Sequence, residues 1–200
     1  MKHLLLISLT AFFFANVTTA QEEQSAEEFQ KELNAQYHDP KESPLKEGAK
    51  TFKGHQFFEI DSTFAVKAKF TRTVGAIPFQ MKTSTSRLPI YEKYGEVTFV
   101  LEGESFTLSI YQNHNLREKE AFKEHLFLPY TDLTNGEETY SGGRYIDLKI
   151  PKGDMMLIDF NKSYNPYCAY TEGYSCPIPP AENNLNYRIR AGVKKPKKAH

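Results

Sequence analysis

The sequence predicts a mainly β protein, either an antiparallel β-sandwich or a small β-barrel, with a short N-terminal helix. From His55 onward, apolar and polar residues alternate in about eight short runs, as they do in half-buried antiparallel strands. No helical pattern separates these runs, whereas an α/β fold alternates its strands with helices. The aromatic residues are Tyr and Phe, which favour strands.

The first twenty residues have the layout of a secretory signal peptide. Lys2 and His3 form a basic start, residues 4–17 are largely apolar, and residues 18–20 place small side chains at the −3 and −1 positions. The apolar run is shorter than the roughly 20 residues that a membrane-spanning helix needs, and no other stretch comes close. We therefore expect an exported protein, periplasmic or secreted, with no transmembrane segment after removal of the signal.

The charge of the chain is balanced, with 25 Lys and Arg residues against 25 Asp and Glu residues. Such a chain has no overall field that favours a nucleic acid or an anionic membrane, so we expect no nucleic-acid partner. Residues 194–200 are locally basic but lack aromatic residues and an apolar face, and we interpret them as a solvated tail. The sequence sets no oligomeric state.

The segment 21–54 precedes the β region and is predicted to contain one helix and a linker. Ser25 and Glu28 have the spacing of a capping box, in which each side chain satisfies a backbone N–H of the other. Three aromatic or apolar residues then recur at helical spacing: Phe29, Leu33 and Tyr37. The helix should end before Pro40, because the residue before a proline is disfavoured in the α conformation. Residues 41–53 are polar and read as a linker on the surface.

The first half of the β region contains three predicted strands and a hairpin. Residues 58–70 alternate as strands, and residues 77–81 form another short strand. The clearest hairpin pairs residues 97–101 with residues 106–111 around the turn-forming tetrad 102–105. Residues 116–125 are predicted to form one or two helical turns.

The second half of the β region begins at residue 127. Residues 127–130 have strand character, and Pro129 suggests an edge strand or a bulge because proline lacks the backbone N–H. Strands are expected over 140–150 and 155–160, and residues 164–180 are irregular and rich in proline. A last strand over 185–191, in which apolar residues alternate with Asn186, Arg188 and Arg190, should close the sheet.

Several long polar strings in this region resemble a known family. They are L-F-L-P at 126–129, N-G-E-E-T-Y-S-G-G-R-Y-I-D at 135–147, D-F-N at 159–161, Y-N-P-Y-C-A-Y at 164–170 and C-P-I-P-P at 176–180. Together they resemble DUF1684, a bacterial family known only as a domain of unknown function. The resemblance covers about residues 55–193 and implies a single β domain there. It brings no established activity, so the residues must be interpreted by their own chemistry.

The two cysteines, Cys168 and Cys176, are most simply a disulfide in an exported chain. Closing this short loop would stabilise the fold by roughly 2–3 kcal/mol and would mainly make an irregular segment rigid. Free or reactive thiols and a zinc site are the alternatives. Zinc takes four ligands, and the histidines lie far away in the sequence, so we predict no metal.

The segment 132–180 holds more polar side chains than an ordinary core, and we interpret it as a ligand pocket. Arg144 follows two glycines, whose backbone conformational freedom would let an anionic group approach closely. For any single residue, the alternative is an internal pair between Arg144 and an acid. The candidate ligand-binding residues are Asp132, Glu138, Tyr140, Arg144, Asp147, Asp159, Asn161, Asn165 and Tyr170.

These candidates support three functional hypotheses. In the first, Arg144 anchors a small polar or anionic ligand, the acids orient it, and the Cys168–Cys176 loop forms one wall. In the second, the protein is a hydrolase with Asp159 or Glu138 as general base and Arg144 as the charge-stabilising group. In the third, the Tyr-Pro loop of an envelope protein binds a partner. No catalytic motif, cofactor fingerprint or calcium loop is present, so no cofactor is predicted.

Overall fold

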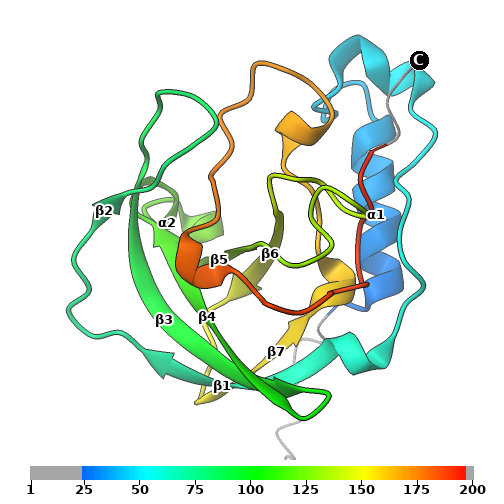
Figure 1. The fold of residues 1–200 in the computed structure, drawn as a ribbon. Helices are drawn as coiled ribbons and strands as arrows, with labels where there is room; N and C mark the ends of the chain where they lie inside the picture. The colour runs from blue at the N-terminus through cyan, green and yellow to red at the C-terminus, as the bar shows by residue number, and fades with distance from the viewer. Residues whose placement is uncertain (1–23, 197–200) are drawn as a thin grey trace, which may run out of the picture.

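The structure of the protein is a computed structural model that describes residues 24–196. The predicted signal peptide at residues 1–20 and the last four residues of the basic tail lie outside the described residues. Figure 1 shows a strongly curved sheet with one helix beside it.

The helix α1 covers Ala26–His38 and begins at the predicted capping box. The Ser25 hydroxyl accepts a hydrogen bond from the Glu28 N–H, and the Glu28 carboxylate accepts one from the Ser25 N–H. The helix packs against the β domain through Tyr37, which is buried, and through Gln30, whose amide donates to the Asn161 carbonyl. The predicted linker contains one short 3₁₀ turn, η1, at Lys46–Thr51.

The sheet has seven antiparallel strands, which confirms the predicted fold class. They are β1 (Ala65–Arg72), β2 (Phe79–Gln80), β3 (Ile90–Leu101), β4 (Glu104–Asn113), β5 (His125–Tyr130), β6 (Arg144–Lys149) and β7 (Met155–Asp159). The strand order is β6-β5-β4-β3-β1-β7, with β2 paired to β3. Since β3 and β4 are long and bend over their whole length, the sheet forms a half-barrel (Figure 1).

Short helical turns connect the strands. The turns predicted within residues 116–125 are α2 (His114–Arg117) and η3 (Glu120–Phe122), and the first begins earlier than expected because Asn113 caps it. The other turns are η2 (Ser62–Phe64), η4 (Phe160–Lys162), η5 (Tyr167–Ala169) and η6 (Ala181–Asn183).

Alternate residues of six strands point into the half-barrel and form the main core. The buried set is Val66, Ala68, Val97, Phe99, Leu101, Leu108, Ile110, Leu126, Leu128, Tyr130, Ile146, Leu148 and Ile158. Three residues after the last strand, Leu185, Ile189 and Ala191, complete this core from the open side. Burying each large aliphatic side chain contributes about 1.5–3 kcal/mol, so the sheet and the C-terminal segment stabilise each other.

The predicted strand over 185–191 is wrong. Ile189 and Ala191 do point into the core, as the alternation indicated, but the segment joins no strand of the sheet. The backbone of its first half bonds to the loop backbone of Thr131 and Leu133. In its second half, side chains take the backbone groups: the Ile189 N–H donates to Asp132, and the carbonyls of Ile189 and Ala191 accept from Arg144. In Figure 1 this segment crosses the open face of the half-barrel.

Other predicted strands are shorter in the structure. The strand expected over 140–150 starts at Arg144, because residues 140–143 form a turn closed by a hydrogen bond from the Gly143 N–H to the Tyr140 carbonyl. Gly143 has a φ of +89° there, and a Cβ would lie 2.7 Å from the Tyr130 carbonyl oxygen. Only glycine fits this conformation and this close approach.

Pro129 does not lie on an edge strand, since β5 stands between β4 and β6. Strands β4 and β5 pair through Tyr111 and Phe127, and beyond this point Asn183 fills the space between them. Its amide oxygen accepts from the Ser109 N–H at 2.8 Å, and its amide nitrogen donates to the Ser109 and Pro129 carbonyls at 2.8 and 2.7 Å. The buried Asn183 side chain therefore replaces the pairing that a proline interrupts.

We expect Asn183→Ala to lower the free energy of unfolding by roughly 2–4 kcal/mol, because three buried backbone groups lose their partner. Urea denaturation followed by circular dichroism measures this loss. Asn184→Ala is the matched control: Asn184 is exposed and makes one side-chain bond, to Thr131, so this variant should stay close to wild type. Equal stability of the two variants would contradict the bridging role of Asn183.

Candidate functional site

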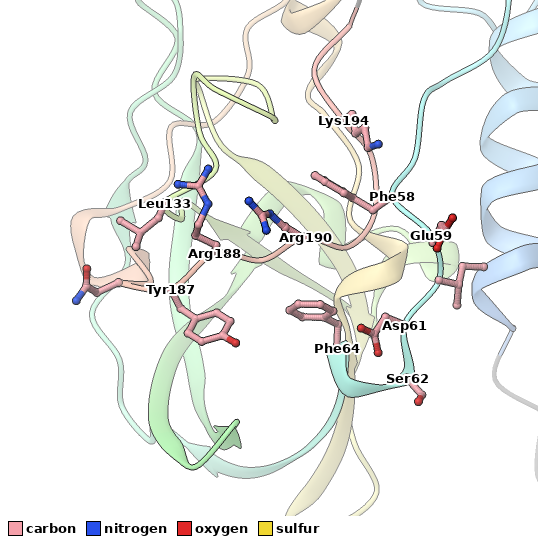
Figure 2. Close-up of a pocket in the computed structure, with 12 residues that line it drawn as sticks. Phe58, Glu59, Asp61, Ser62, Phe64, Leu133, Tyr187, Arg188, Arg190 and Lys194 are labelled. Carbon is pink, nitrogen blue, oxygen red and sulfur yellow. The ribbon is translucent and has the colours of Figure 1, made fainter.

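An open pocket of about 990 Å³ lies where the C-terminal segment passes the start of β1. Two segments form its walls, residues 58–64 and residues 186–194, and Leu133 completes it (Figure 2). The lining residues are Phe58, Glu59, Ile60, Asp61, Ser62, Phe64, Leu133, Asn186, Tyr187, Arg188, Arg190 and Lys194. A pocket with both aromatic and charged lining is typical of sites for small polar ligands.

The two walls differ in chemical character. The C-terminal wall supplies the three cations, Arg188, Arg190 and Lys194, and the opposite wall supplies the acids Glu59 and Asp61. Three aromatic residues also line the pocket, Phe58, Phe64 and Tyr187, with Phe58 near Lys194 and Phe64 near Asp61 (Figure 2). The Tyr187 hydroxyl donates to Glu102 at 2.6 Å, and this hydrogen bond raises the pKa of Tyr187 to about 12.

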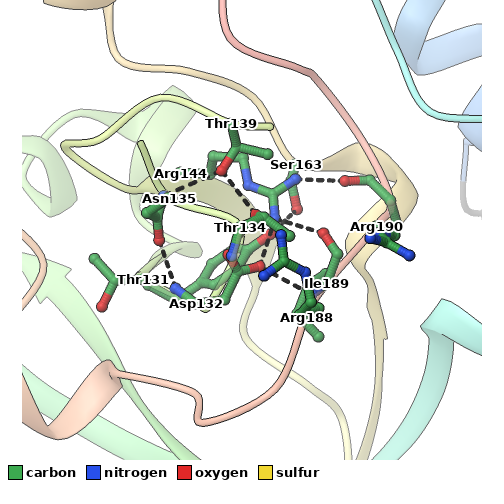
Figure 3. A network of polar contacts seen from close by, with 12 residues as sticks. Thr131, Asp132, Thr134, Asn135, Thr139, Arg144, Ser163, Arg188, Ile189 and Arg190 are labelled. Atoms are coloured by element: carbon green, nitrogen blue, oxygen red, sulfur yellow. Dashed lines mark hydrogen bonds and ion pairs between the residues drawn. The ribbon is translucent and has the colours of Figure 1, made fainter. Parts of the chain in front are cut away.

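The C-terminal wall is held from behind by a buried ion pair between Arg144 and Asp132 (Figure 3). Their nitrogen and oxygen lie 2.7 Å apart, and both side chains are fully buried. Arg144 also donates to the Ile189 carbonyl at 2.8 Å and to the Ala191 carbonyl, while Asp132 accepts from the Ile189 N–H at 3.1 Å. The pair thus holds the backbone on either side of Arg190.

Asp132 and Arg144 have further contacts that fix the pair. Asp132 accepts from the backbone N–H and the hydroxyl of Thr134, which lie in the turn that follows it. The Arg144 guanidinium carbon lies 5.3 Å from the centroid of the Tyr130 ring. The Arg144 Nε is buried without a hydrogen-bond partner among the described residues.

The pocket arginines are oriented by two neighbouring acids. Glu138 accepts from both arginines, at 3.0 Å from Arg188 and at 2.9 to 3.2 Å from Arg190, and Glu137 accepts from Arg188 at 2.6 Å. The hydrogen bonds from Arg190, and then those from Arg188, hold the pKa of Glu138 below its ordinary value. Glu138 therefore stays ionised and keeps both arginines at the edge of the pocket.

The opposite wall is held by two predicted site residues, Asp159 and Asn161. The Asp159 carboxylate accepts from the backbone N–H and the amide of Asn161, both of which are buried. The Asn161 amide then makes two hydrogen bonds to the backbone of Asp61, at 2.9 and 3.1 Å. At the pocket, hydrogen bonds from the Thr63 backbone and hydroxyl lower the pKa of the Asp61 carboxyl.

The last cation of the pocket is positioned by Asn165 and Tyr170. The amide nitrogen of Asn165 donates to the Lys194 carbonyl and to the Tyr170 hydroxyl, each at 3.0 Å. The Lys195 N–H donates to the Glu138 carbonyl, which joins this contact to the arginine cluster. Lys194 and Lys195, which the sequence assigned to a solvated tail, are thus hydrogen-bonded through their backbone.

Two predicted site residues lie apart from the pocket. The Tyr140 carbonyl accepts from Asn135 at 2.6 Å, within the turn before β6. Asp147, on β6, bonds to His125 at 2.9 Å and to the Tyr164 hydroxyl at 2.8 Å. Neither residue lines the pocket or bonds to its walls.

The disulfide between Cys168 and Cys176 is formed, with the two Cα atoms 6.5 Å apart. Its loop packs against α1 through Tyr37, whose ring lies 5.1 Å from Tyr170 and 6.1 Å from Tyr167. No residue of this loop is among those that line the pocket, so the wall that the sequence suggested there belongs to other segments.

The pocket therefore divides into lining residues and supporting residues. None of the nine predicted site residues lines the pocket. Seven of them support its walls: Asp132, Glu138, Arg144, Asp159, Asn161, Asn165 and Tyr170. Sequence reasoning missed the lining residues because they belong to runs with strand-like alternation. The one available signal was two arginines on the polar face of the Tyr-Arg-Ile-Arg run at 187–190.

Among residues 24–196, no three or more His, Cys, Asp and Glu side chains are grouped so that they could hold a metal ion. Within the same residues, no helix is both long enough and apolar enough to cross a membrane.

The fold and the pocket define a class: an antiparallel half-barrel whose open side is filled by the C-terminal segment, with a polar pocket beside that segment. This chain belongs to the family described as "Protein of unknown function (DUF1684)", which matches residues 50–194. The predicted family membership is thus confirmed.

A solved structure of similar fold comes from Haloarcula marismortui. It is the solution NMR structure of the uncharacterized protein from gene locus rrnAC0354, which is 30% identical, with a TM-score of 0.64. The similarity covers 82% of this chain and 89% of that chain. No curated protein matches this chain.

We expect Arg144→Met to lower the free energy of unfolding by about 3–5 kcal/mol, because it leaves the Asp132 carboxylate buried without its partner. The double variant Arg144→Met/Asp132→Leu should recover only part of this loss. It removes the unpaired charge, but the carbonyls of Ile189 and Ala191 still lose their donor. Urea denaturation of both variants measures the difference, and full recovery in the double variant would show that the carbonyl bonds contribute nothing.

Proposed function

We propose that this protein binds a small polar or anionic ligand in the pocket between residues 58–64 and 186–194. The observation that carries the proposal is the support of the pocket walls. Buried or half-buried polar side chains bond to the backbone of Asp61, of Ile189 and Ala191, and of Lys194. Each of these backbone positions lies in or beside the lining of the pocket.

Support of this kind lowers the cost of binding. A ligand loses affinity when binding has to order loops and side chains, and rigid walls avoid most of that cost. The lining segments contain little regular structure: the short turn η2 lies within 58–64, and an isolated bridge joins Phe57 to Val193. Backbone hydrogen bonds from the Phe58 N–H to the Gly192 carbonyl and from the Lys194 N–H to the Gln56 carbonyl tie the two walls together at this end. The polar side chains behind the walls hold them at further points, and this favours a site over an incidental hollow.

Binding is favoured over the hydrolase alternative by the place of Arg144. The guanidinium is fully buried and donates to Asp132 and to backbone carbonyls, so it faces no solvent-accessible space. A group that stabilises developing charge must reach the reacting atoms.

The partner-binding alternative is weakened because Tyr167 and Tyr170 pack against Tyr37 of α1.

A ligand screen by thermal shift tests the proposal. The mature chain is heated with neutral sugars, sugar acids, sugar phosphates, nucleotides and organic acids, one at a time. A ligand at about 100 times its dissociation constant adds roughly 2.7 kcal/mol of stability, which raises the melting temperature visibly. We expect at least one class to do so, and Arg190→Gln to weaken the response.

The control for this screen is Lys149→Gln, which removes an exposed charge of β6 outside the pocket lining. It should leave both the melting temperature and the response unchanged. A response that survives Arg190→Gln and also Asp61→Asn would place the ligand elsewhere and refute the proposal.

The proposed ligand would be met outside the cytoplasm. The support for export is the signal-like pattern of residues 1–20 together with the Cys168–Cys176 disulfide, since disulfides persist in oxidising compartments. When the whole gene is expressed, we expect cell fractionation to recover the protein outside the cytoplasm, cleaved near residue 20. Before reduction, neither cysteine of this protein should react with maleimide. Full-length protein with two reactive thiols in the cytoplasmic fraction would contradict export.

A further inference from the structure

The cations of the pocket have donors that their own ion pairs do not use. Arg190 gives Nε and Nη2 to Glu138, and Arg188 gives Nη2 to Glu137 and Glu138. The Arg188 Nε is buried and does not reach a ligand, whereas the Arg190 Nη1 makes no hydrogen bond among the described residues. Lys194 has no carboxylate within 4.0 Å in the described part of the chain, and its Nζ lies 4.7 Å from the centroid of the Phe58 ring. This wall therefore offers spare donors to an anionic group.

Arg190 and Lys194 frame one end of the pocket. Figure 2 shows their nitrogen atoms on either side of the Phe58 ring. A carboxylate or a phosphate at this end meets a cation on each side of that ring, and hydrogen bonds in which both partners are charged are the strongest that such a rim can make. Arg190 and Lys194 thus form a positively charged end of the pocket, although the whole chain has a formal net charge of +0.

The other end of the pocket accepts hydrogen bonds. Asp61 uses its Oδ1 on Thr63, while its Oδ2 makes no hydrogen bond among the described residues, and Ser62 stands next to it in the lining. Figure 2 shows the Asp61 carboxylate beside the Phe64 ring, with Tyr187 across from it. An ionised carboxylate next to aromatic faces suits a ring that carries hydroxyl donors on its edge and C–H groups on its face.

From this arrangement, and resting on the proposed function, we infer that the ligand is an acidic sugar: a hydroxylated six-membered ring that carries a carboxylate or a phosphate. The anionic group binds at the end that carries Arg190 and Lys194, the ring packs against Phe64 and Tyr187, and Asp61 accepts from ring hydroxyls. The two ends differ in sign, so the ligand binds in one direction.

The test uses the mature full-length chain and four probes at equal concentration: glucuronate, glucose 6-phosphate, glucose and AMP. Isothermal titration calorimetry measures each dissociation constant. We expect glucuronate or glucose 6-phosphate to bind at least about tenfold more tightly than glucose, since a charge-assisted contact at the rim contributes about 1.4 kcal/mol or more. The acidic sugar that binds more tightly shows whether the end with Arg190 and Lys194 prefers a carboxylate or a phosphate.

Two variants assign the ends of the pocket. Lys194→Gln should weaken the acidic sugar about tenfold while leaving glucose unchanged, because it removes only the anion contact. Asp61→Asn should weaken the acidic sugar and glucose by the same factor, because both present ring hydroxyls. Lys149→Gln is the control, and the melting temperature of each ligand-free variant shows that it is folded.

The outcomes separate the inference from the proposed function. If glucose binds as tightly as glucuronate and glucose 6-phosphate, or if AMP alone binds, the acidic-sugar inference is overturned while the pocket remains a binding site. An acidic sugar that binds Lys194→Gln with unchanged affinity also overturns it. If none of the four probes binds, the inference falls, and the broader screen then decides whether the proposed function falls with it.

Discussion

The ion pair between Arg144 and Asp132 is the interaction on which the C-terminal half of this structure depends. Removing two charges from water costs several kcal/mol per ion, and their attraction offsets this only when further hydrogen bonds satisfy both groups. Here the further bonds reach the backbone of Ile189 and Ala191. The ion pair is thus hydrogen-bonded to the segment that fills the half-barrel. Without this segment the ion pair would lose these hydrogen bonds, and without the ion pair the backbone of the segment would lose them.

The same ion pair connects the core to the pocket. Ile189 and Ala191 are buried in the apolar core, whereas Arg188 and Arg190, which alternate with them, line the pocket. Asn161 and Asn165 act in a similar way on Asp61 and Lys194, through backbone contacts. These supporting side chains are buried behind the walls, and the side chains that line the pocket come from the segments that they hold.

The sequence was sufficient where the structure is decided by neighbours along the chain. The capping box of Ser25 and the hairpin around residues 102–105 are of this kind, and both were predicted. It was insufficient at residues 185–191, because alternation reports which side chains are buried and does not say what bonds the backbone. The pocket lining could not be predicted for a related reason. The sequence offered an internal pair between Arg144 and an acid as an alternative, and Asp132 is that acid. The main-chain groups that the two residues also bind lie 45 to 57 positions away and leave no mark in residue type.

The place of the C-terminal segment has a consequence for the order in which the molecule can assemble. Every strand of the sheet precedes Asn183, Ile189 and Ala191 in the chain, yet these residues bridge β4 to β5 and close the core. While the chain is still being synthesised, Arg144 has no main-chain acceptors on this segment and the apolar side of the sheet faces water. A half-barrel without this segment lacks three buried side chains of its core, so less apolar surface is removed from water. Completion of the fold therefore depends on residues 183–191, which follow every strand in the chain.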